Sequence, residues 1–409
     1  MKDCTVGEVA APIRNALVGG PFGSDLVSKD YVPAGVPVIR GTNMGHGRWV
    51  DGEFAYVTHE KAESLSANCA KPGDIVFTQR GTLGQVALVP ERGADRYLIS
   101  QSQMKLSVDA EKADAVFLYY VFTSAEQQDY IRQNAIQTGV PHTNLGILRN
   151  TPITLPPLAE QKAIAAVLGA LDDKIELNRR MNATLEAMAR ALFQSWFVDF
   201  DPVRAKLDGR SPAVLDSATA ALFPDSFHET KVGHIPTGWQ LGRLADLCNL
   251  KRGHDLPTST RTAGAIPVIS SSGISGTNSE TNVRGPGVVT GRYGTIGKVF
   301  YVETDYWPLN TTLYVEDFRG NPPRFIFHAL GEVNFANYTD KAAVPGVNRN
   351  HLHEEPTVLP PIELRQAFAR AVSPLWSQHA ANERQSRTLA TLRDTLLPKL
   401  LSGEISPMR

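Results

Sequence analysis

The chain of 409 residues has three cysteines, no long apolar segment and almost no net charge. Cys4, Cys69 and Cys248 lie far apart in the sequence, which argues against a disulfide framework and against a CxxC metal or redox site. We expect them to be small buried hydrophobic residues. No apolar run approaches the roughly 20 residues that cross a bilayer, and the N-terminal residues MKDCTVGEVA lack the pattern of a signal peptide. We therefore expect a cytoplasmic protein with no membrane partner.

The charges of the chain are balanced. Lysine and arginine number 41, aspartate and glutamate number 42, and the formal charge is −1. This balance gives the whole molecule no attraction to DNA or to acidic membranes. Nucleic-acid binding must therefore be local, or shared with a partner. With 42% hydrophobic residues the composition is that of a globular protein, and the length suggests two to three domains.

The sequence contains the same plan twice, which favours an even number of domains. The paired phrases are GVPVIRGTNM (35–44) with AIPVISSSGI (265–274), GDIVFTQRGTLGQVALVPE (73–91) with GVVTGRYGTIGKVFYVE (287–303), and VPHTNLGILRNTPITLPP (140–157) with VPGVNRNHLHEEPTVLPP (344–361). The last pair has a constant offset of 204 residues (344 minus 140), whereas the earlier offsets differ. Insertions and deletions are thus concentrated in the N-terminal part of each half.

Each half changes composition after its Leu-Pro-Pro phrase. Before it, short apolar runs such as DIVF and KVFYV are bounded by Gly, Pro, Asn and Ser, which predicts a compact, mostly antiparallel β-rich domain. After the first such phrase, residues 158–197 contain no proline and Gly169 as the only glycine. This predicts a helix about 60 Å long, suited to act as a spacer.

The apolar positions of both predicted helices follow the 4-3 spacing of a coiled coil with a polar centre. The seam positions are Ile164, Leu168, Leu171, Ile175, Asn178, Asn182, Leu185, Ala189, Leu192 and Trp196, and then Phe368, Val372, Leu375, His379, Asn382, Ser386, Leu389, Arg393, Leu396 and Leu400. We expect an antiparallel pair within one chain, in which Asn178 faces Asn382 and sets the register. A seam between two chains is the alternative.

The stretch GRYGTIGKV (291–299) resembles a phosphate-binding loop only at first sight. Gly291, Gly294 and Gly297 are spaced three apart, and Lys298 is followed by a strand-like run in place of a helix. We expect a tight hairpin or a bulge, from which polar side chains could reach guanine edges or phosphates.

Two further motifs give weak signals for chemistry. NPPR (321–324) resembles the Asn-Pro-Pro-aromatic motif of amino-methyltransferases, but Arg324 replaces the aromatic residue and no glycine-rich cofactor loop precedes it. HLHEE (351–355) has neither the HExxH nor a zinc-finger spacing, and we expect a solvated loop there. No catalytic set can be assigned from spacing, so the sequence predicts a protein that binds a target and catalyses no reaction.

Four phrases carry a resemblance to the DNA-specificity subunit of type I restriction-modification systems. They are LPPLAEQKAIAAVL (155–168), MARALFQSWFVDFDPVRAK (188–206), IPTGW (235–239) and LRDTLLPKLLSGEI (392–405). The resemblance spans the whole chain. The second repeat departs from the pattern with Leu364 and Arg365 where the first has Glu160 and Gln161, which we interpret as tolerated drift.

The resemblance implies an α+β fold with two β-rich target-recognition domains in pseudo-twofold repeat, separated by two long antiparallel coiled-coil helices. The expected boundaries are a first recognition domain at 1–155, a first spacer helix at 156–200, a connecting segment at 201–235, a second recognition domain at 236–357, and a second spacer helix with the C-terminal tail at 358–409.

The resemblance also implies a function. Such a subunit is non-catalytic, reads a bipartite, asymmetric sequence in double-stranded DNA, and docks two adenine methyltransferase subunits and restriction/translocase subunits. The helices would set the unread gap between the half-sites. No cofactor is expected in this chain, because S-adenosylmethionine, ATP and Mg would be bound by the partner subunits. The pocket for the flipped adenine would also belong to a partner.

The expected DNA-contacting residues lie on the polar loops of the two repeats. They are Arg40, Thr42, Asn43, Gln79, Arg80 and Thr82 in the first domain, and Ser270, Ser271, Ser272, Arg292, Tyr293, Thr295 and Lys298 in the second. For any one of them an ordinary polar loop explains the residue equally well. Asn144 and Asn348, at matched positions, are expected to be structural turn residues. A protein-binding scaffold remains the alternative from another class, and a degenerate methyltransferase built on NPPR is a weaker one.

Overall fold

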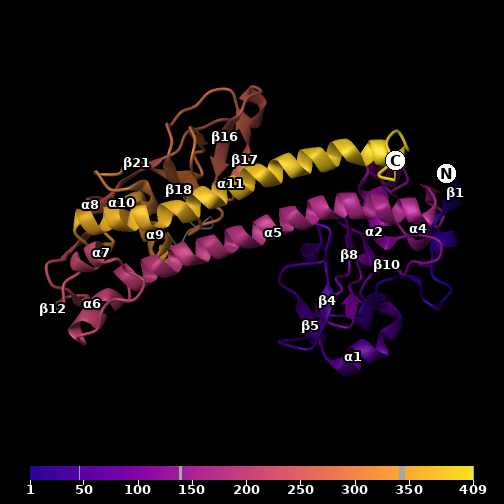
Figure 1. The fold of residues 1–409 in the computed structure, drawn as a ribbon, viewed down its shortest axis with the longest axis horizontal. Helices are drawn as coiled ribbons and strands as arrows, with labels where there is room; N and C mark the ends of the chain where they lie inside the picture. The colour runs from indigo at the N-terminus through magenta and orange to yellow at the C-terminus, as the bar shows by residue number, and fades with distance from the viewer. Residues whose placement is uncertain (46, 138–140, 340–345, 409) are drawn as a thin grey trace. The chain divides into compact units, whose positions relative to one another are not determined.

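The computed structural model describes residues 1–45, 47–137, 141–339 and 346–408. The chain forms two compact units, Met1–Met181 with Ala381–Arg409, and Asn182–Ala380. Each unit holds one β-rich domain and parts of both long helices, α5 (Leu158–Phe197) and α11 (Ile362–Leu401) (Figure 1). The repeated phrases that begin at 140 and 344 start outside the described residues, because Val140, Val344 and Pro345 are not described.

The first unit contains two larger sheets. One has the strand order β2 (Leu17–Gly19), β10 (Gln103–Leu106), β7 (Ile75–Thr78), β8 (Val86–Leu88). The other has the order β3 (Tyr31–Val32), β5 (Ala55–Val57), β4 (Val36–Ile39), β9 (Tyr97–Ile99), β6 (Cys69–Ala70). Its short helices are α1 (His59–Ser64), α2 (Ala115–Thr123), α3 (Ala125–Gln133) and α4 (Leu145–Arg149).

The second unit repeats this arrangement with fewer strands. Its sheets have the orders β15 (Asn249–Arg252), β21 (Thr312–Asp317), β18 (Gly287–Gly291), β19 (Val299–Val302), and β17 (Gly273–Asn278), β16 (Ile266–Ser270), β20 (Trp307–Pro308). A hairpin of β12 (Phe227–Thr230) and β13 (Gly233–Pro236) precedes them. Its short helices are α6 (Asp201–Leu207), α7 (Ser217–Ala221), α8 (Leu244–Leu247), α9 (Pro323–Gly331) and α10 (Arg349–His353).

A short antiparallel strand pair joins the beginning of each β-rich domain to its end. In the first unit β1 (Lys2–Thr5) pairs with β11 (Pro152–Leu155), directly before α5. In the second unit β14 (Gln240–Arg243) pairs with β22 (Pro356–Leu359), directly before α11. We call these two ladders the terminal strand pairs. Both domains therefore start and finish at the beginning of a long helix.

The strand pairing confirms the internal repeat that the sequence predicts. The parallel pair of β4 and β9, with Val38 opposite Leu98, has its counterpart in β16 and β20, with Val268 opposite Trp307. The hairpin of β7 and β8 corresponds to that of β18 and β19, where the glycine-rich stretch forms the turn. The hairpin interpretation of that stretch is thus confirmed.

The long helices contribute a different kind of side chain to each core. In the first unit, Ile164 and Leu168 of α5 and Leu400 of α11 are buried with Phe117 and Leu118 of α2. In the second unit, α5 supplies aromatic residues. They pack as tilted or edge-on pairs with rings of α9 and α11, and the rings involved are Phe193, Trp196, Phe197, Phe325 and Phe368.

Side chains at the polar centre of the helix seam form hydrogen bonds within the chain, although the buried Oδ1 of Asn178 has no hydrogen-bond partner among the described residues. In the first unit the Asn178 side-chain amide donates to the Asn382 carbonyl oxygen (3.3 Å) and to Gln385 Oε1 (2.9 Å). In the second unit Asn182 donates to the His379 carbonyl oxygen (3.3 Å), and the His379 ring lies 2.9 Å from Glu186. Residue numbers rise along α5 as they fall along α11, so the helices are antiparallel. The expected pairing within one chain is confirmed.

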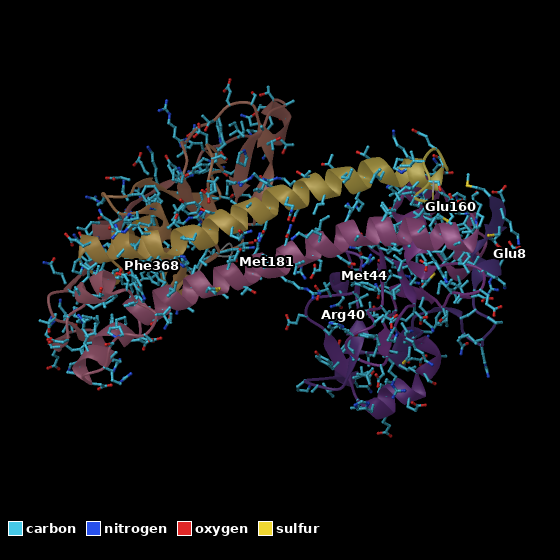
Figure 2. The ribbon with its side chains drawn as sticks, in the orientation of Figure 1. Glu8, Arg40, Met44, Glu160, Met181 and Phe368 are labelled. Atoms are coloured by element: carbon cyan, nitrogen blue, oxygen red, sulfur yellow. The ribbon has the colours of Figure 1, made fainter. Side chains whose placement is uncertain are left out.

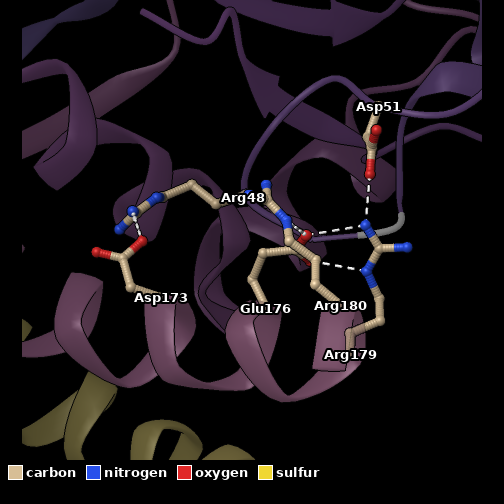
Figure 3. Close-up of polar contacts among 6 residues, drawn as sticks. All are labelled: Arg48, Asp51, Asp173, Glu176, Arg179 and Arg180. Atoms are coloured by element: carbon tan, nitrogen blue, oxygen red, sulfur yellow. Dashed lines mark hydrogen bonds and ion pairs between the residues drawn. The ribbon is translucent and has the colours of Figure 1, made fainter. Parts of the chain in front are cut away.

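Polar contacts hold the first β-rich domain against α5 (Figure 3). Buried Arg48 donates to Asp173 (2.5 Å) and, at 3.4 Å, to the Tyr120 hydroxyl. Asp51 accepts from Arg179 (2.6 Å), which is also bound to Glu176 of the same helix. A charge pair of this kind contributes little energy where it is exposed, but it fixes geometry. The domain is thus oriented on the helix by directional bonds as well as by apolar packing.

Two expectations about the second repeat are wrong. The HLHEE segment is no solvated loop, because Arg349–His353 forms helix α10 and His353 Nε2 accepts a hydrogen bond from the Leu250 amide (2.9 Å). Burial lowers the pKa of His353, which suits a neutral ring that accepts this bond. The pattern missed this helix because it spans only five residues, too few to show a helical period. Asn348 is its N-cap, as Asn144 is the N-cap of α4. The structural role of both asparagines is confirmed.

The exchange of Gln161 for Arg365 is also more than drift. Both side chains donate to the carbonyl oxygen of a matched proline, Gln161 to Pro156 (2.9 Å) and Arg365 to Pro360 (2.6 Å). Gln161 also accepts from the Asp114 amide at the start of α2, whereas Arg365 donates to the Asn321 side chain just before α9. Each residue connects a short helix to the start of a long one. The Gln161 side-chain oxygen accepts from an amide, whereas the Arg365 guanidinium donates to a side-chain oxygen.

We predict that Asn178→Ala lowers the free energy of unfolding by about 1 to 3 kcal/mol, because it leaves buried acceptors of α11 without their donor. Urea denaturation followed by far-UV circular dichroism measures this change. Leu177→Ala is the matched control, since Leu177 is the preceding residue of the same helix and is exposed. Equal stability of Asn178→Ala and the wild type would contradict the structural role of this amide.

We predict that acid destabilises the chain through His328. Burial, followed by the charges of Arg324 and Arg190, lowers the pKa of His328 to about 4, whereas the unfolded value is 6.5. Between these values the unfolded chain binds a proton that the folded chain excludes, so stability falls as the pH falls. Lowering the pH from 7 to 5 should cost about 2 kcal/mol, and His328→Phe should remove this loss.

The test is urea denaturation of both proteins at pH 7 and at pH 5. His234→Gln, at an exposed position, is the control and should keep the wild-type loss. Phenylalanine suits the site because the ring stacks on Phe193 and its Nε2 has no hydrogen-bond partner within the described residues. An undiminished loss in His328→Phe would assign the pH dependence to another group.

Candidate nucleic-acid interface

In the first unit, four loops meet at the ends of the two larger sheets. The turn 100–102 connects the two sheets. The Ser100 amide donates to the Ile39 carbonyl oxygen at the end of β4 (2.9 Å), and the Gln79 amide, just after β7, donates to the Ser102 carbonyl oxygen (2.6 Å). The Gly20 amide donates to the Gln103 carbonyl oxygen (2.8 Å), and the Thr143 amide to that of Gln79 (3.0 Å). We call these loops the first loop cluster; its segments are 20–26, 40–43, 79–85 and 100–102.

The first loop cluster borders a cavity of about 480 Å³. Its polar lining includes Gln79, Arg80, Gln101, Asn68 and Asp25. Amide, guanidinium and carboxylate groups of this kind are the ones that bind base edges and phosphates in DNA complexes. The cavity is therefore chemically suited to a polar polymer with exposed donors and acceptors.

The structure brings all six predicted residues of the first domain into this cluster. Arg80, Thr82 and Thr42 are exposed, and Gln79 and Arg40 are half-buried. The residues Arg40 and Met44 mark this part of the chain in Figure 2.

Asn43 differs from its neighbours because it is fully buried. Its side chain donates to the carbonyl oxygens of Asp51 (3.2 Å) and Glu53 (3.0 Å) and accepts from the Arg40 amide (3.0 Å). These bonds give Asn43 the role of holding its own turn, and in this conformation the side chain is not open to a ligand.

The second unit contains a second loop cluster with the same backbone framework. The Gly253 amide donates to the Thr312 carbonyl oxygen (3.1 Å), the Leu309 amide to that of Ile269 (2.8 Å), and the Arg292 amide to that of Thr311 (2.8 Å). The Val347 amide donates to the Arg292 carbonyl oxygen (2.9 Å). The segments of the second loop cluster are 253–256, 270–273, 292–298 and 309–311.

All the predicted residues of the second domain lie in this cluster. The Ser270 hydroxyl donates to the Gly273 carbonyl oxygen (2.9 Å), with Ser271 half-buried and Ser272 exposed beside it. The Arg292 guanidinium lies 4.4 Å from the centre of the Tyr293 ring. Thr295 and Lys298 are exposed on the hairpin, and the Lys298 ammonium lies 5.2 Å from the Phe300 ring centre.

The matched hydrogen bonds pair the residues of the two clusters one by one. Gln79 corresponds to Arg292 and Arg80 to Tyr293, because both pairs donate their amides to the same turn, 100–102 in one unit and 309–311 in the other. The glycines of the hairpins correspond too. Gly81 (φ +94°) and Gly84 (φ +88°) match Gly294 (φ +78°) and Gly297 (φ +85°), which explains the glycine spacing, since other residues rarely adopt this conformation.

Sequence reasoning missed the segments 20–26 and 100–102 of the first unit and the segment 253–256 of the second, although the polar residues at 310–312 could be recognised. A signal was present in Gly20 and Gly253, where the backbone approaches so closely that only glycine fits. A Cβ atom at Gly20 would lie 1.9 Å from the Ser100 carbonyl oxygen, and one at Gly253 would lie 2.2 Å from that of Leu309. The GGPFG phrase (19–23) could therefore have indicated a loop pressed against another strand end.

The NPPR segment has a structural role. Asn321 is buried, donates to the Leu247 carbonyl oxygen (2.8 Å) and accepts from Arg365 (2.6 Å). Arg324 is paired with Glu303 and lies between the rings of Tyr301 and Trp376, 3.4 and 4.2 Å from their centres. Neither side chain is free for a substrate. The described residues contain no cluster of three potential metal ligands, and no helix among them is long and apolar enough to cross a membrane.

Comparisons with known proteins agree on one family. A family model described as the type I restriction modification DNA specificity domain matches residues 28–187 and 236–389. The type I restriction enzyme HindI specificity subunit of Haemophilus influenzae is 25% identical over 399 residues, which cover 82% of this chain and 87% of that protein. The type I restriction enzyme MjaIX specificity subunit of Methanocaldococcus jannaschii is 22% identical over an alignment of 427 positions, gaps included, which covers 98% of this chain and 91% of that protein.

A solved structure shows the same fold. The S subunit of a type I restriction-modification system from M. genitalium superposes with a TM-score of 0.55 at 19% identity, over 98% of this chain and 95% of that one.

Proposed function

We propose a function for this chain on the premise that it belongs to the type I restriction-modification DNA specificity family, whose model matches both of its halves. The proposed function is sequence-specific binding of double-stranded DNA. Each loop cluster would read one half of a bipartite, asymmetric target, and the paired helices would set a fixed gap between the halves. The chain itself would catalyse no reaction.

One observation supports the bipartite target above all others. The two loop clusters share a backbone framework bond by bond, yet the side chains that they present differ, as with Gln79 against Arg292 and Arg80 against Tyr293. Different donors and acceptors at matched positions select different base pairs. Two clusters of this kind in one chain would give two unlike half-sites, and hence an asymmetric target.

The proposed partners follow from the family and from the charge balance. We propose that the chain docks two adenine methyltransferase subunits and restriction/translocase subunits, which would bind S-adenosylmethionine, ATP and Mg. A chain with a formal charge of −1 provides little general attraction to phosphates. Partner subunits that contact the backbone would supply the rest. This assembly would place the chain in the cytoplasm.

We predict that Arg80→Ala and Arg292→Ala each alter a different half of the methylated motif. The full chain with its methyltransferase partner is incubated with DNA, and adenine methylation is mapped by single-molecule sequencing. Wild type should give a bipartite motif with a fixed gap. Each variant should lose about 1 to 3 kcal/mol of discrimination at one or two positions of one half-site, and the other half-site should stay unchanged.

Arg92→Ala is the matched control, since Arg92 is exposed in the connection between β8 and β9 and lies outside the first loop cluster. A protein-binding scaffold would give no motif with an active partner. It would also bind its ligand with little dependence on salt, whereas DNA affinity falls steeply with the logarithm of the salt concentration.

We predict that matched heptad insertions lengthen the gap. Seven residues added after Met181 in α5 and seven after Ala380 in α11 leave the internal contacts of each compact unit intact and preserve the heptad phase. Each insertion adds about 10 Å of helix, equal to roughly three base pairs. Methylation mapping should show the same half-sites with a longer gap.

The control inserts seven residues into α5 alone, which breaks the pairing of the two helices and should destabilise the chain. An unchanged gap with both insertions present would show that the helices do not set it.

A further inference from the structure

We infer that Phe22 contacts a base of the first half-site and helps to select it. This inference rests on the proposed function. It assigns a role in specificity to Phe22, which is not among the DNA-contacting residues expected from the sequence. The observation behind it is that an aromatic side chain, 87% exposed, projects from a firmly held loop at the edge of the cavity lined by Gln79 and Arg80.

The loop that carries Phe22 is fixed at both ends. Before Phe22, the Gly20 amide donates to the Gln103 carbonyl oxygen, and a side chain at Gly20 would clash with Ser100. After Phe22, the Gln101 side chain donates to the carbonyl oxygens of Gly23 (2.5 Å) and Leu26 (3.1 Å). The Phe22 ring is thus exposed although its backbone is anchored.

An exposed aromatic residue by itself is common and needs no function. Its position decides here. Phe22 lines the same cavity as the exposed Arg80 and the half-buried Gln79. The cavity is also lined by Gln101 and Asn68, whose NH2 groups hold the loop while their side-chain oxygens remain as acceptors. Polar groups around one apolar ring suit a DNA base, which has a polar edge and an apolar face or, in thymine, a methyl group.

The second loop cluster provides the comparison. Gly253 makes the framework bond of Gly20, so Asp255 occupies the position of Phe22. The Asp255 carboxylate accepts from Asn310, which matches Gln101 in the turn between the sheets. The framework bond of the glycine is therefore kept in both clusters, while the tip changes from an exposed aromatic ring to a carboxylate that the turn holds. Two domains that recognise different half-sites are expected to differ at such a position, where the backbone is held in the same way and the side chain differs.

The test measures base preference position by position. The full chain with its methyltransferase partner is titrated against duplexes that carry each single base-pair substitution in either half-site of the mapped motif. Phe22→Ala should flatten the preference at one or two adjacent positions of the first half-site by roughly five- to tenfold, and Phe22→Leu should retain part of it. The first half-site is the one that Arg80→Ala alters, and the second should be unaffected.

Ile13→Ala is the matched control, because Ile13 is 60% exposed in the same unit but lies outside the first loop cluster. Thermal unfolding shows whether Phe22→Ala folds like the wild type, and Phe22→Leu provides the measurement if it does not. Unchanged preferences, or an equal loss of affinity on every duplex, would overturn the inference. Failure of the proposed function is a distinct result, since the wild type would then show no preference at either half-site.

Discussion

The terminal strand pairs are the constraint on which the rest of the structure depends. Each holds the first and last strands of a β-rich domain together for four residue pairs, immediately before a long helix begins. Because both ends of the domain are tied at that point, the chain between them can lengthen or shorten without displacing the helix. The cost of a longer surface segment grows only slowly with its length, so the fold tolerates large differences between the two domains.

The numbering of matched residues shows this tolerance. Gly20 and Gly253 are 233 residues apart, Gly81 and Gly294 are 213 apart, and Thr143 and Val347 are 204 apart. The first domain thus has 20 more residues than the second between its loop at 20–26 and its hairpin. The extra residues include helix α1 and the strands β3 and β6, which enlarge the second sheet from three strands to five. From Thr143 and Val347 onward the offset stays at 204 residues through the long helices, where Asn178 meets Asn382 in the seam.

Periodicity and repetition therefore predicted the parts that local chemistry determines. The heptads located both helices and the Asn178 contact, and the glycines located both hairpins, since their left-handed backbone allows few other residues. Interactions between segments that are distant in the chain could not be predicted from the sequence. The burial of Asn43 depends on the carbonyl groups of Asp51 and Glu53, and the pairing of Arg365 with Asn321 joins residues 44 positions apart. The turn 100–102 is central only because strands from three parts of the chain end beside it.

A reading surface needs a rigid frame as well as variable tips. If the loops moved freely, the same donors would fit several base patterns and discrimination would be lost, because ordering them on binding would cost free energy. Here the backbone bonds of the loop clusters are conserved between the two units, and Arg48 and Asp51 tie the first domain directly to α5. On the proposed function, specificity can then change through side chains alone, at positions such as 22 and 255, 79 and 292, or 80 and 293. The domains can diverge in what they bind while the helices that carry them stay the same.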